Sequence, residues 1–282
     1  MSLLFKRSTI KWCEENSAYS YSIYIAEFFN TLTGLCLCLS AYVFYKMNEN
    51  NSSIINKLRK SLILLFVVGV GTVLFHSTLL YVFQMTDEIP MLLLALEYYY
   101  LVNSMNFNVY DNYLSYLTLN FKYKIYGMSF GIFIIGYISD FLQVLVFQST
   151  LMYIIYLILY KFYLCNKQIE NNLEKLYKRK AFLEEQFLYH YYVNNKLKLI
   201  KKNINNANAL YTKIKIYKYI GLFLTLNSFI VWYIDKNHCN SININGHALW
   251  HILTSIGLFC LNNIIIFYYQ LINLILSSKY TC

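Results

Sequence analysis

Three of the five histidines lie at the ends of long apolar stretches or within them: His76, His247 and His251. His247 and His251 are four residues apart in the sequence GHALWHI, so on a helix they lie one turn apart on the same face. Three imidazoles that converge and leave a fourth ligand position open are what a catalytic zinc ion requires. A buried histidine can also link helices through hydrogen bonds, and the spacing alone leaves this alternative open.

A carboxylate and a hydroxyl group accompany these histidines. Asp87 lies near the start of an apolar stretch, and a carboxylate beside a zinc-bound water can take its proton. Thr72 precedes His76 by one helical turn, so its hydroxyl can point toward a metal there. Taken alone, Thr72 is also typical of a helical hydroxyl bonded to its own backbone. Glu88 is best interpreted as an acidic residue that complements the dipole at a helix N-terminus.

The composition predicts a membrane protein. The chain has 282 residues, of which 58% are hydrophobic and 13% charged, whereas soluble domains have about 25% charged residues. A bilayer core of about 30 Å needs roughly 20 helical residues. The chain is therefore predicted to be an all-α, polytopic membrane protein with a seven-transmembrane helix bundle, forming one domain over residues 1–282. Its seven apolar spans are expected at 22–45, 61–83, 88–106, 123–139, 141–163, 217–234 and 247–276.

The basic residues predict how this bundle is oriented. With seven spans, four of the 24 Lys and Arg residues fall on the side of the N-terminus and 20 on the other side. By the positive-inside rule, residues 1–21 form a luminal segment and the C-terminus is cytosolic. The net charge of +10 is then explained by this orientation in the membrane and by attraction of the basic loops to anionic lipid head groups. Nucleic acid is not expected as a partner. The candidate histidines and Asp87 all fall at the outer ends of their spans.

Residues 165–214 form the one sizeable polar segment, between the fifth and sixth spans. Its first part alternates Glu and Lys with apolar residues and predicts one or two helices. Its second part is rich in Asn and Lys and predicts a flexible stretch. We expect a charged cytosolic insertion with a solvated face, and binding of a cytosolic protein is the alternative.

Two of the seven cysteines, Cys13 and Cys239, fall on the predicted luminal side, where disulfides persist. The other five fall within spans or on the cytosolic side, where thiols stay reduced. We predict a Cys13–Cys239 disulfide that ties the N-terminal segment to the loop before the seventh span.

Several motifs resemble those of the alkaline ceramidase family, whose members are seven-span intramembrane amidases. The similar segments are WCEEN, YIAEFFNT, GVGTVLFHSTL, QMTDEIPM and HALWHI, which begin at Trp12, Tyr24, Gly69, Gln84 and His247. The resemblance covers all seven spans but not residues 165–214. The related adiponectin receptors share the Ser/His/Asp/His-x-x-x-His skeleton and lack WCEEN and IAEF.

Residue by residue, the resemblance implies a zinc site and its acid/base group. It assigns zinc to His76, His247 and His251 and makes Asp87 the acid/base. Thr72 stands at the position of the family's serine near the zinc, where it keeps the hydroxyl and adds a methyl group.

The resemblance also implies a calcium ion beside the zinc. Its ligands would be the Trp12 backbone carbonyl, Glu14, Asn16 and Glu27. This chain departs from the family at Lys11, which replaces an aspartate, and in a longer stretch between the last two ligands. Calcium prefers about six to eight oxygen ligands, so the exchange of a carboxylate for an ammonium group weakens the expected binding.

These assignments predict an enzyme that uses zinc to cleave the N-acyl amide bond of ceramides within the membrane, giving a sphingoid base and a fatty acid. Thr72 would help to hold the developing oxyanion. A ceramide-type lipid is the expected substrate, membrane lipid the expected surroundings, and the endoplasmic reticulum or Golgi the expected location. The alternative is a seven-span, lipid-sensing receptor similar to the adiponectin receptors, with a structural zinc. The presence of Asp87 and Thr72 favours the enzyme.

Overall fold

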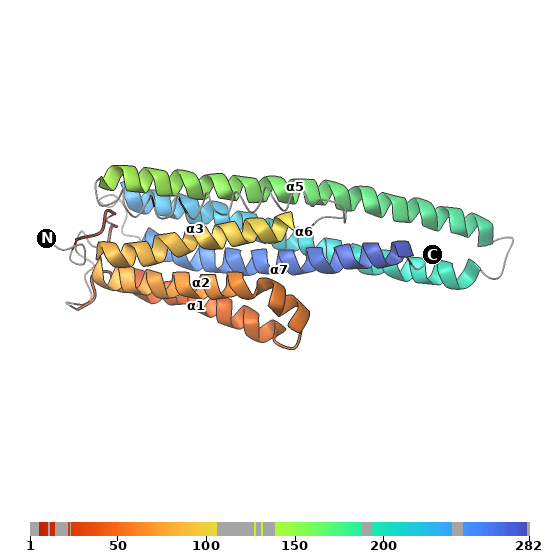
Figure 1. The fold of residues 1–282 in the computed structure, drawn as a ribbon, viewed down its shortest axis with the longest axis horizontal. Helices are drawn as coiled ribbons and strands as arrows, with labels where there is room; N and C mark the ends of the chain where they lie inside the picture. Colours follow the sequence, from red (N-terminus) through yellow and green to blue (C-terminus); the bar gives the residue numbers. More distant parts are fainter. Residues whose placement is uncertain are drawn as a thin grey trace.

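The computed structural model describes residues 6–10, 12–14, 22, 24–105, 127, 131, 139–187, 193–238 and 245–280. In these residues, six long helices run side by side along one axis (Figure 1). This arrangement confirms the predicted all-α fold. The helices are α1 (Phe28–Asn48), α2 (Ser52–Thr78), α3 (Tyr81–Asn103), α5 (Asp140–Phe187), α6 (Val193–Asn237) and α7 (Gly246–Tyr280).

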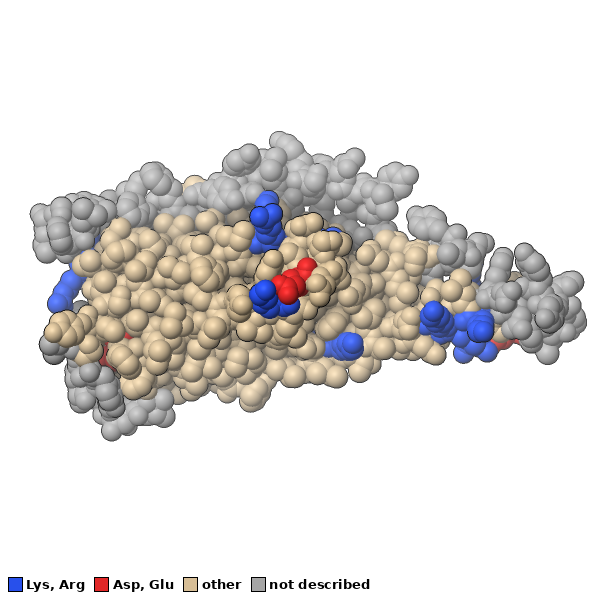
Figure 2. All heavy atoms as spheres, turned by 90° about the horizontal axis from the view of Figure 1, so that it is seen from below, with Lys and Arg blue, Asp and Glu red and all other residues tan. Residues whose placement is uncertain are grey.

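Five of the described helices are long and apolar enough to cross a membrane: α1, α2, α5, α6 and α7. Their outer surface agrees, since large apolar side chains such as Leu39 on α1 and Phe223 on α6 are 56% and 66% exposed. Figure 2 shows one face on which most atoms belong to uncharged residues and basic side chains gather in a few places. Such a surface suits lipid rather than water. The chain is therefore a polytopic membrane protein.

The number of seven spans stays a prediction. The α3 helix has 23 residues and carries the carboxyl side chains of Asp87, Glu88 and Glu97, and it is not among the helices apolar enough to count as a candidate span. The predicted fourth span, 123–139, lies outside the described residues apart from positions 127, 131 and 139.

The predicted boundary between the second and third spans was wrong. The α2 helix ends at Thr78 rather than at residue 83, Leu79 adopts a left-handed conformation with φ 51°, and α3 begins at Tyr81. No Pro or Gly marks this break. Instead, the N-terminal segment supplies backbone partners: Ser8 N–H donates to Leu79 O at 2.9 Å, and Tyr81 N–H donates to Lys6 O at 2.9 Å. Because these contacts are distant in sequence, local patterns could not reveal them.

The segment 165–214 also differs from the prediction. Its Asn- and Lys-rich part is helical, because α5 and α6 continue beyond the apolar spans and pair with each other as two long helices (Figure 1). We call residues 165–187 and 193–214 the α5–α6 hairpin. Its two helices bury a narrow apolar seam, which stabilises the helices where local composition does not. The seam includes Ile169, Leu173, Leu176, Ile200, Ile204 and Ala207.

Neighbouring helices form a closed ring in the order α1, α2, α3, α5, α6, α7 and back to α1. The end of α2 and the start of α7 therefore both border α1. The end of α2, the starts of α1, α3, α5 and α7, and the end of α6 all lie at the same end of the bundle. We call it the histidine end, because it holds the three candidate histidines.

Candidate metal centre

The structure brings the three predicted histidines together. His76 lies in the last turn of α2, and His247 and His251 lie in the first two turns of α7. All three side chains are buried, and one ring nitrogen of each lies within 4.8 Å of the others. The Nε2 atoms of His76 and His247 are 3.2 Å apart. Three imidazoles in this arrangement could hold one metal ion between them.

Groups outside the cluster orient two of the rings. His76 Nδ1 lies 2.5 Å from Glu27 Oε2, and His251 Nδ1 lies 3.0 Å from Thr33 Oγ1. These contacts occupy Nδ1 and leave Nε2 of each ring for another partner. His251 Nε2 is buried and has no hydrogen-bond partner in the described part of the chain. A buried nitrogen without a partner costs free energy, and a metal ion would remove that cost. The site therefore fits a metal held by three imidazoles.

Aromatic rings fix the third histidine. The His247 ring stacks on Trp12 with centroids 3.6 Å apart and planes 15° apart, and on Trp250 at 5.1 Å and 13°. Trp12 is only 3% exposed. This stacking restricts the imidazole to one plane and keeps water from that side of the cluster. It also gives the Trp12 side chain a role that the sequence did not reveal, because the family resemblance implies a role only for the backbone carbonyl of Trp12.

Asp235 at the end of α6 joins three segments of the site. Its carboxylate accepts hydrogen bonds from the backbone N–H groups of Gly246 and His247 at the start of α7. It also accepts one from Cys13 N–H at 3.2 Å. Carboxylates bind well to the free N–H groups of a helix N-terminus, so Asp235 anchors the helix that carries two of the histidines. Sequence reasoning missed it, although a lone acidic residue at the outer end of an apolar span was a usable signal.

Cys13 is disulfide-bonded in the structure. Cys239, its predicted partner, lies outside the described residues, so the pairing stays a prediction.

The predicted acid/base and hydroxyl are in direct contact. Thr72 Oγ1 lies 2.7 Å from Asp87 Oδ1 and 2.9 Å from the backbone oxygen of Val68. Both Thr72 and Asp87 are buried. The contact requires α2 and α3 to lie very close together at this level, and Gly71 permits it: a Cβ atom there would lie 2.2 Å from Thr86 O. Thr72 is also one turn before His76 on α2, so the hydroxyl connects Asp87 to the histidine end.

Glu88 does not lie at a helix N-terminus, contrary to the interpretation from sequence. Because α3 starts at Tyr81, Glu88 is in its third turn and is buried. Gln84 Nε2 donates to one of its oxygens at 2.8 Å, and Gln143 of α5 donates to the other. Thr9 of the N-terminal segment closes this network through Gln84 and Gln143. The carboxyl group thus helps to hold α3, α5 and the N-terminal segment together.

Two of the predicted calcium ligands, Glu14 and Glu27, lie at the start of α1. Glu14 accepts hydrogen bonds from the backbone N–H groups of Phe29 at 2.6 Å and Asn30 at 3.0 Å. Burial raises the pKa of Glu14, and these two N–H groups oppose the rise. Glu27 accepts from Asn30 Nδ2 at 2.9 Å. Asn16, another predicted ligand, lies outside the described residues.

Two buried oxygen atoms beside Glu14 fit a hard cation. In the part of the chain that the structure describes, Glu27 Oε1 and Asn30 Oδ1 have no hydrogen-bond partner, although the backbone N–H of Trp12 lies near the Glu27 carboxylate. Calcium prefers carboxylate and amide oxygens of this kind. Asn30 was not predicted from sequence, although it stands one helical turn after Glu27. Because the other oxygen of Glu27 contacts His76, one carboxylate would touch both candidate metal sites.

Fold and site together define a class: a polytopic helical membrane protein with three buried histidines that could hold a metal and a carboxylate close by. Comparison with known proteins identifies the particular family. The family model described as Ceramidase matches residues 5–280, and the chain belongs to this family. The resemblance found in the sequence motifs is thereby confirmed.

Curated relatives agree with this assignment. The chain is 30% identical to alkaline ceramidase YPC1 of Saccharomyces cerevisiae over 274 residues, which cover 89% of this chain and 73% of the relative. It is 27% identical to an alkaline ceramidase of Arabidopsis thaliana over 92% of this chain and 83% of the relative. For alkaline ceramidase 3 of Mus musculus, identity is 24% over 89% of this chain and 79% of the relative.

Proposed function

We propose that this protein hydrolyses the N-acyl amide bond of ceramides to a sphingoid base and a fatty acid, with zinc bound by His76, His247 and His251. The convergence of three buried imidazoles within 4.8 Å carries this proposal. Membership of the ceramidase family supports the substrate class and the reaction. When bound, a zinc ion would lower the pKa of its water to near neutral and would itself polarise the amide carbonyl.

The residues of this chain have separate roles in the proposed reaction. Asp87 takes a proton from the attacking water and returns it to the nitrogen of the departing sphingoid base, so that no net proton is gained or lost by the enzyme. Thr72, within 2.7 Å of Asp87, orients the carboxylate and lies near the developing oxyanion. Glu27 and Thr33 orient the imidazoles of His76 and His251.

We further propose that calcium binds at the start of α1, through Glu14, Glu27, Asn16 and the Trp12 carbonyl, with Asn30 as an additional ligand. Through its contact with His76, Glu27 would link calcium binding to the geometry of the zinc ligands. The distribution of basic residues supports a luminal N-terminus and a cytosolic C-terminus. The endoplasmic reticulum or Golgi is the location that we propose.

The test uses full-length protein purified in detergent and a ceramide whose released fatty acid is measured. We expect chelator-sensitive release and about one equivalent of bound zinc by elemental analysis. His251→Ala should lose both the metal and the activity, and Asp87→Asn should keep the metal while its rate falls about 10²- to 10⁴-fold.

His238→Ala is the matched control, because His238 also lies at the histidine end, after α6, but is not in the cluster. It should behave like the unmodified protein. Full activity in His251→Ala or in Asp87→Asn would refute the proposed mechanism.

A further inference from the structure

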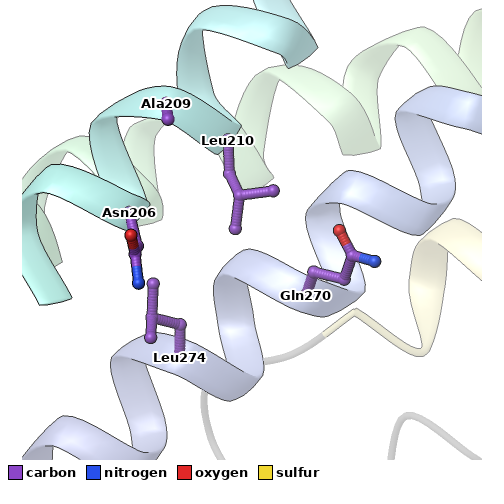
Figure 3. A pocket seen from close by; sticks show the side chains of 5 residues that line it. All are labelled: Asn206, Ala209, Leu210, Gln270 and Leu274. Atoms are coloured by element: carbon purple, nitrogen blue, oxygen red, sulfur yellow. The ribbon is translucent and has the colours of Figure 1, made fainter.

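An open cavity of about 370 Å³ lies at the surface between α6 and α7, at a distance from the histidine end. Figure 3 shows Asn206 and Leu210 pointing from α6 toward α7, and Leu274 pointing back toward Asn206. The volume is within the range of about 300–1,000 Å³ that is usual for ligand sites. The lining residues are Asn206, Ala209, Leu210, Gln270 and Leu274.

The position along α7 indicates what surrounds this cavity. At about 1.5 Å per residue, α7 rises about 35 Å from His247 to Gln270. The hydrocarbon core of a bilayer is about 30 Å thick. If His247 lies at one boundary of that core, the cavity lies just beyond the opposite boundary, at the level of the lipid head groups.

The chemistry of the cavity suits a phosphate group beside an acyl chain. Asn206 and Gln270 are exposed, and in the described residues their amides make no hydrogen bond with the protein, so both NH₂ groups can donate to a ligand. The lining contains no carboxylate. Leu210 and Leu274 supply an apolar wall for the first carbons of a lipid chain.

Two lysines, Lys213 and Lys57, lie near the cavity without lining it. Lys213 lies one turn after Ala209 on α6, and its ammonium group reaches across to the Phe267 ring of α7 at 5.5 Å. Beyond Gln270, a smaller hollow of about 50 Å³ is lined by Lys57 of α2, whose ammonium lies 3.8 Å from the Tyr269 ring. Basic pockets between transmembrane helices bind anionic head groups.

We propose that this cavity binds the phosphate-bearing head group of an anionic phospholipid from the leaflet opposite the histidine end. Asn206 and Gln270 donate to the phosphate oxygens, and Lys213 and Lys57 balance its charge. The lipid would join α6 to α7 at the base of the α5–α6 hairpin. This site is separate from the candidate metal centre and does not depend on the proposed reaction.

The test measures lipid binding by native mass spectrometry on delipidated, full-length protein. The probes are phosphatidylinositol and phosphatidylcholine with the same acyl chains. We expect at least tenfold tighter binding of phosphatidylinositol. Lys213→Gln should weaken it about fivefold, while Lys215→Gln should not, because Lys215 lies over Tyr211 on another face of the same helix.

A second variant, Ala209→Phe, fills the cavity without a change of charge and should also abolish the preference for phosphatidylinositol. Glycerol 3-phosphate distinguishes a lipid from a soluble phosphate, since it has no acyl chains; it should fail to displace the lipid. Equal binding of the two lipids, equal effects of Lys213→Gln and Lys215→Gln, or displacement by glycerol 3-phosphate would overturn the proposal.

Discussion

The histidine end and the α5–α6 hairpin use charged residues in opposite ways. At the histidine end, Glu14, Glu27 and Asp87 are buried and contact backbone N–H groups, an amide, an imidazole or a hydroxyl. In the hairpin, acidic side chains such as Glu174 and Glu184 are exposed and pair with lysines. Buried ionisable groups are costly in a membrane protein and mark functional sites, whereas exposed ion pairs contribute little to stability.

The two regions also differ in how closely their helices pack. At the histidine end, α2 and α3 approach so closely that Gly71 leaves no room for a methyl group. The hairpin is held by one seam of apolar side chains and a few exposed polar contacts, such as Tyr211 OH to Glu170 at 2.6 Å. We therefore expect substitutions to affect the first region far more than the second.

The largest effect is expected from Gly71→Ala. The added Cβ would lie 2.2 Å from Thr86 O, a backbone atom that cannot move aside without shifting the start of α3. Overpacking of this kind costs about 1–3 kcal/mol, and the shift would separate Asp87 from Thr72. We expect a lower melting temperature together with reduced ceramide hydrolysis.

The control for Gly71→Ala is Gly221→Ala on α6, where the nearest atom to a new Cβ would be Cys260 Cβ at 3.4 Å. That contact is ordinary, so stability and activity should be retained. Equal destabilisation by both substitutions would mean that the close approach of α2 and α3 is not what makes Gly71 sensitive.

An intermediate effect is expected from Glu27→Gln, which keeps the shape of the side chain and removes its charge. Loss of the carboxylate that orients His76 should lower metal affinity about 10- to 100-fold. Competition with a chelator measures this. Glu49→Gln at the exposed end of α1 is the control and should leave the affinity unchanged. Unaltered affinity in Glu27→Gln would mean that the carboxylate does not support the metal site.

The smallest effect is expected from Lys201→Gln in the hairpin. The hydrogen bond from Lys201 holds the pKa of Glu184 below its usual value. Because the native pKa is lowered, the ion pair favours the folded state at neutral pH, and this contribution is lost as the pH falls through the pKa of the carboxyl group.

Both groups of this pair are exposed, so the melting temperature at neutral pH should not change measurably in Lys201→Gln. Metal content should also stay constant. A loss of stability as large as that of Gly71→Ala would show that the hairpin is coupled to the bundle more strongly than its contacts indicate.

Local patterns predicted much of the fold and part of the site. Apolar segments of membrane length predicted a helical bundle, and the motif around His247 and His251 predicted two histidines on one helix face. The break at Leu79 and the helical character of the Asn-rich part of α6 were not predicted. Each depends on a partner far away in the sequence: the N-terminal segment in one case and α5 in the other.

The sequence by itself determined which residues could do chemistry, because residue type and helical spacing depend only on neighbouring positions in the chain. It determined that the protein spans a membrane, because length and hydrophobicity of a segment decide that question. Only the tertiary structure decided which of these groups meet. The ring order of the helices places α1 between α2 and α7, and so sets Glu27 against His76 and Thr33 against His251. The N-terminal segment packs on the same end and sets Trp12 against His247. Such contacts follow from the packing of whole helices, which no single segment encodes.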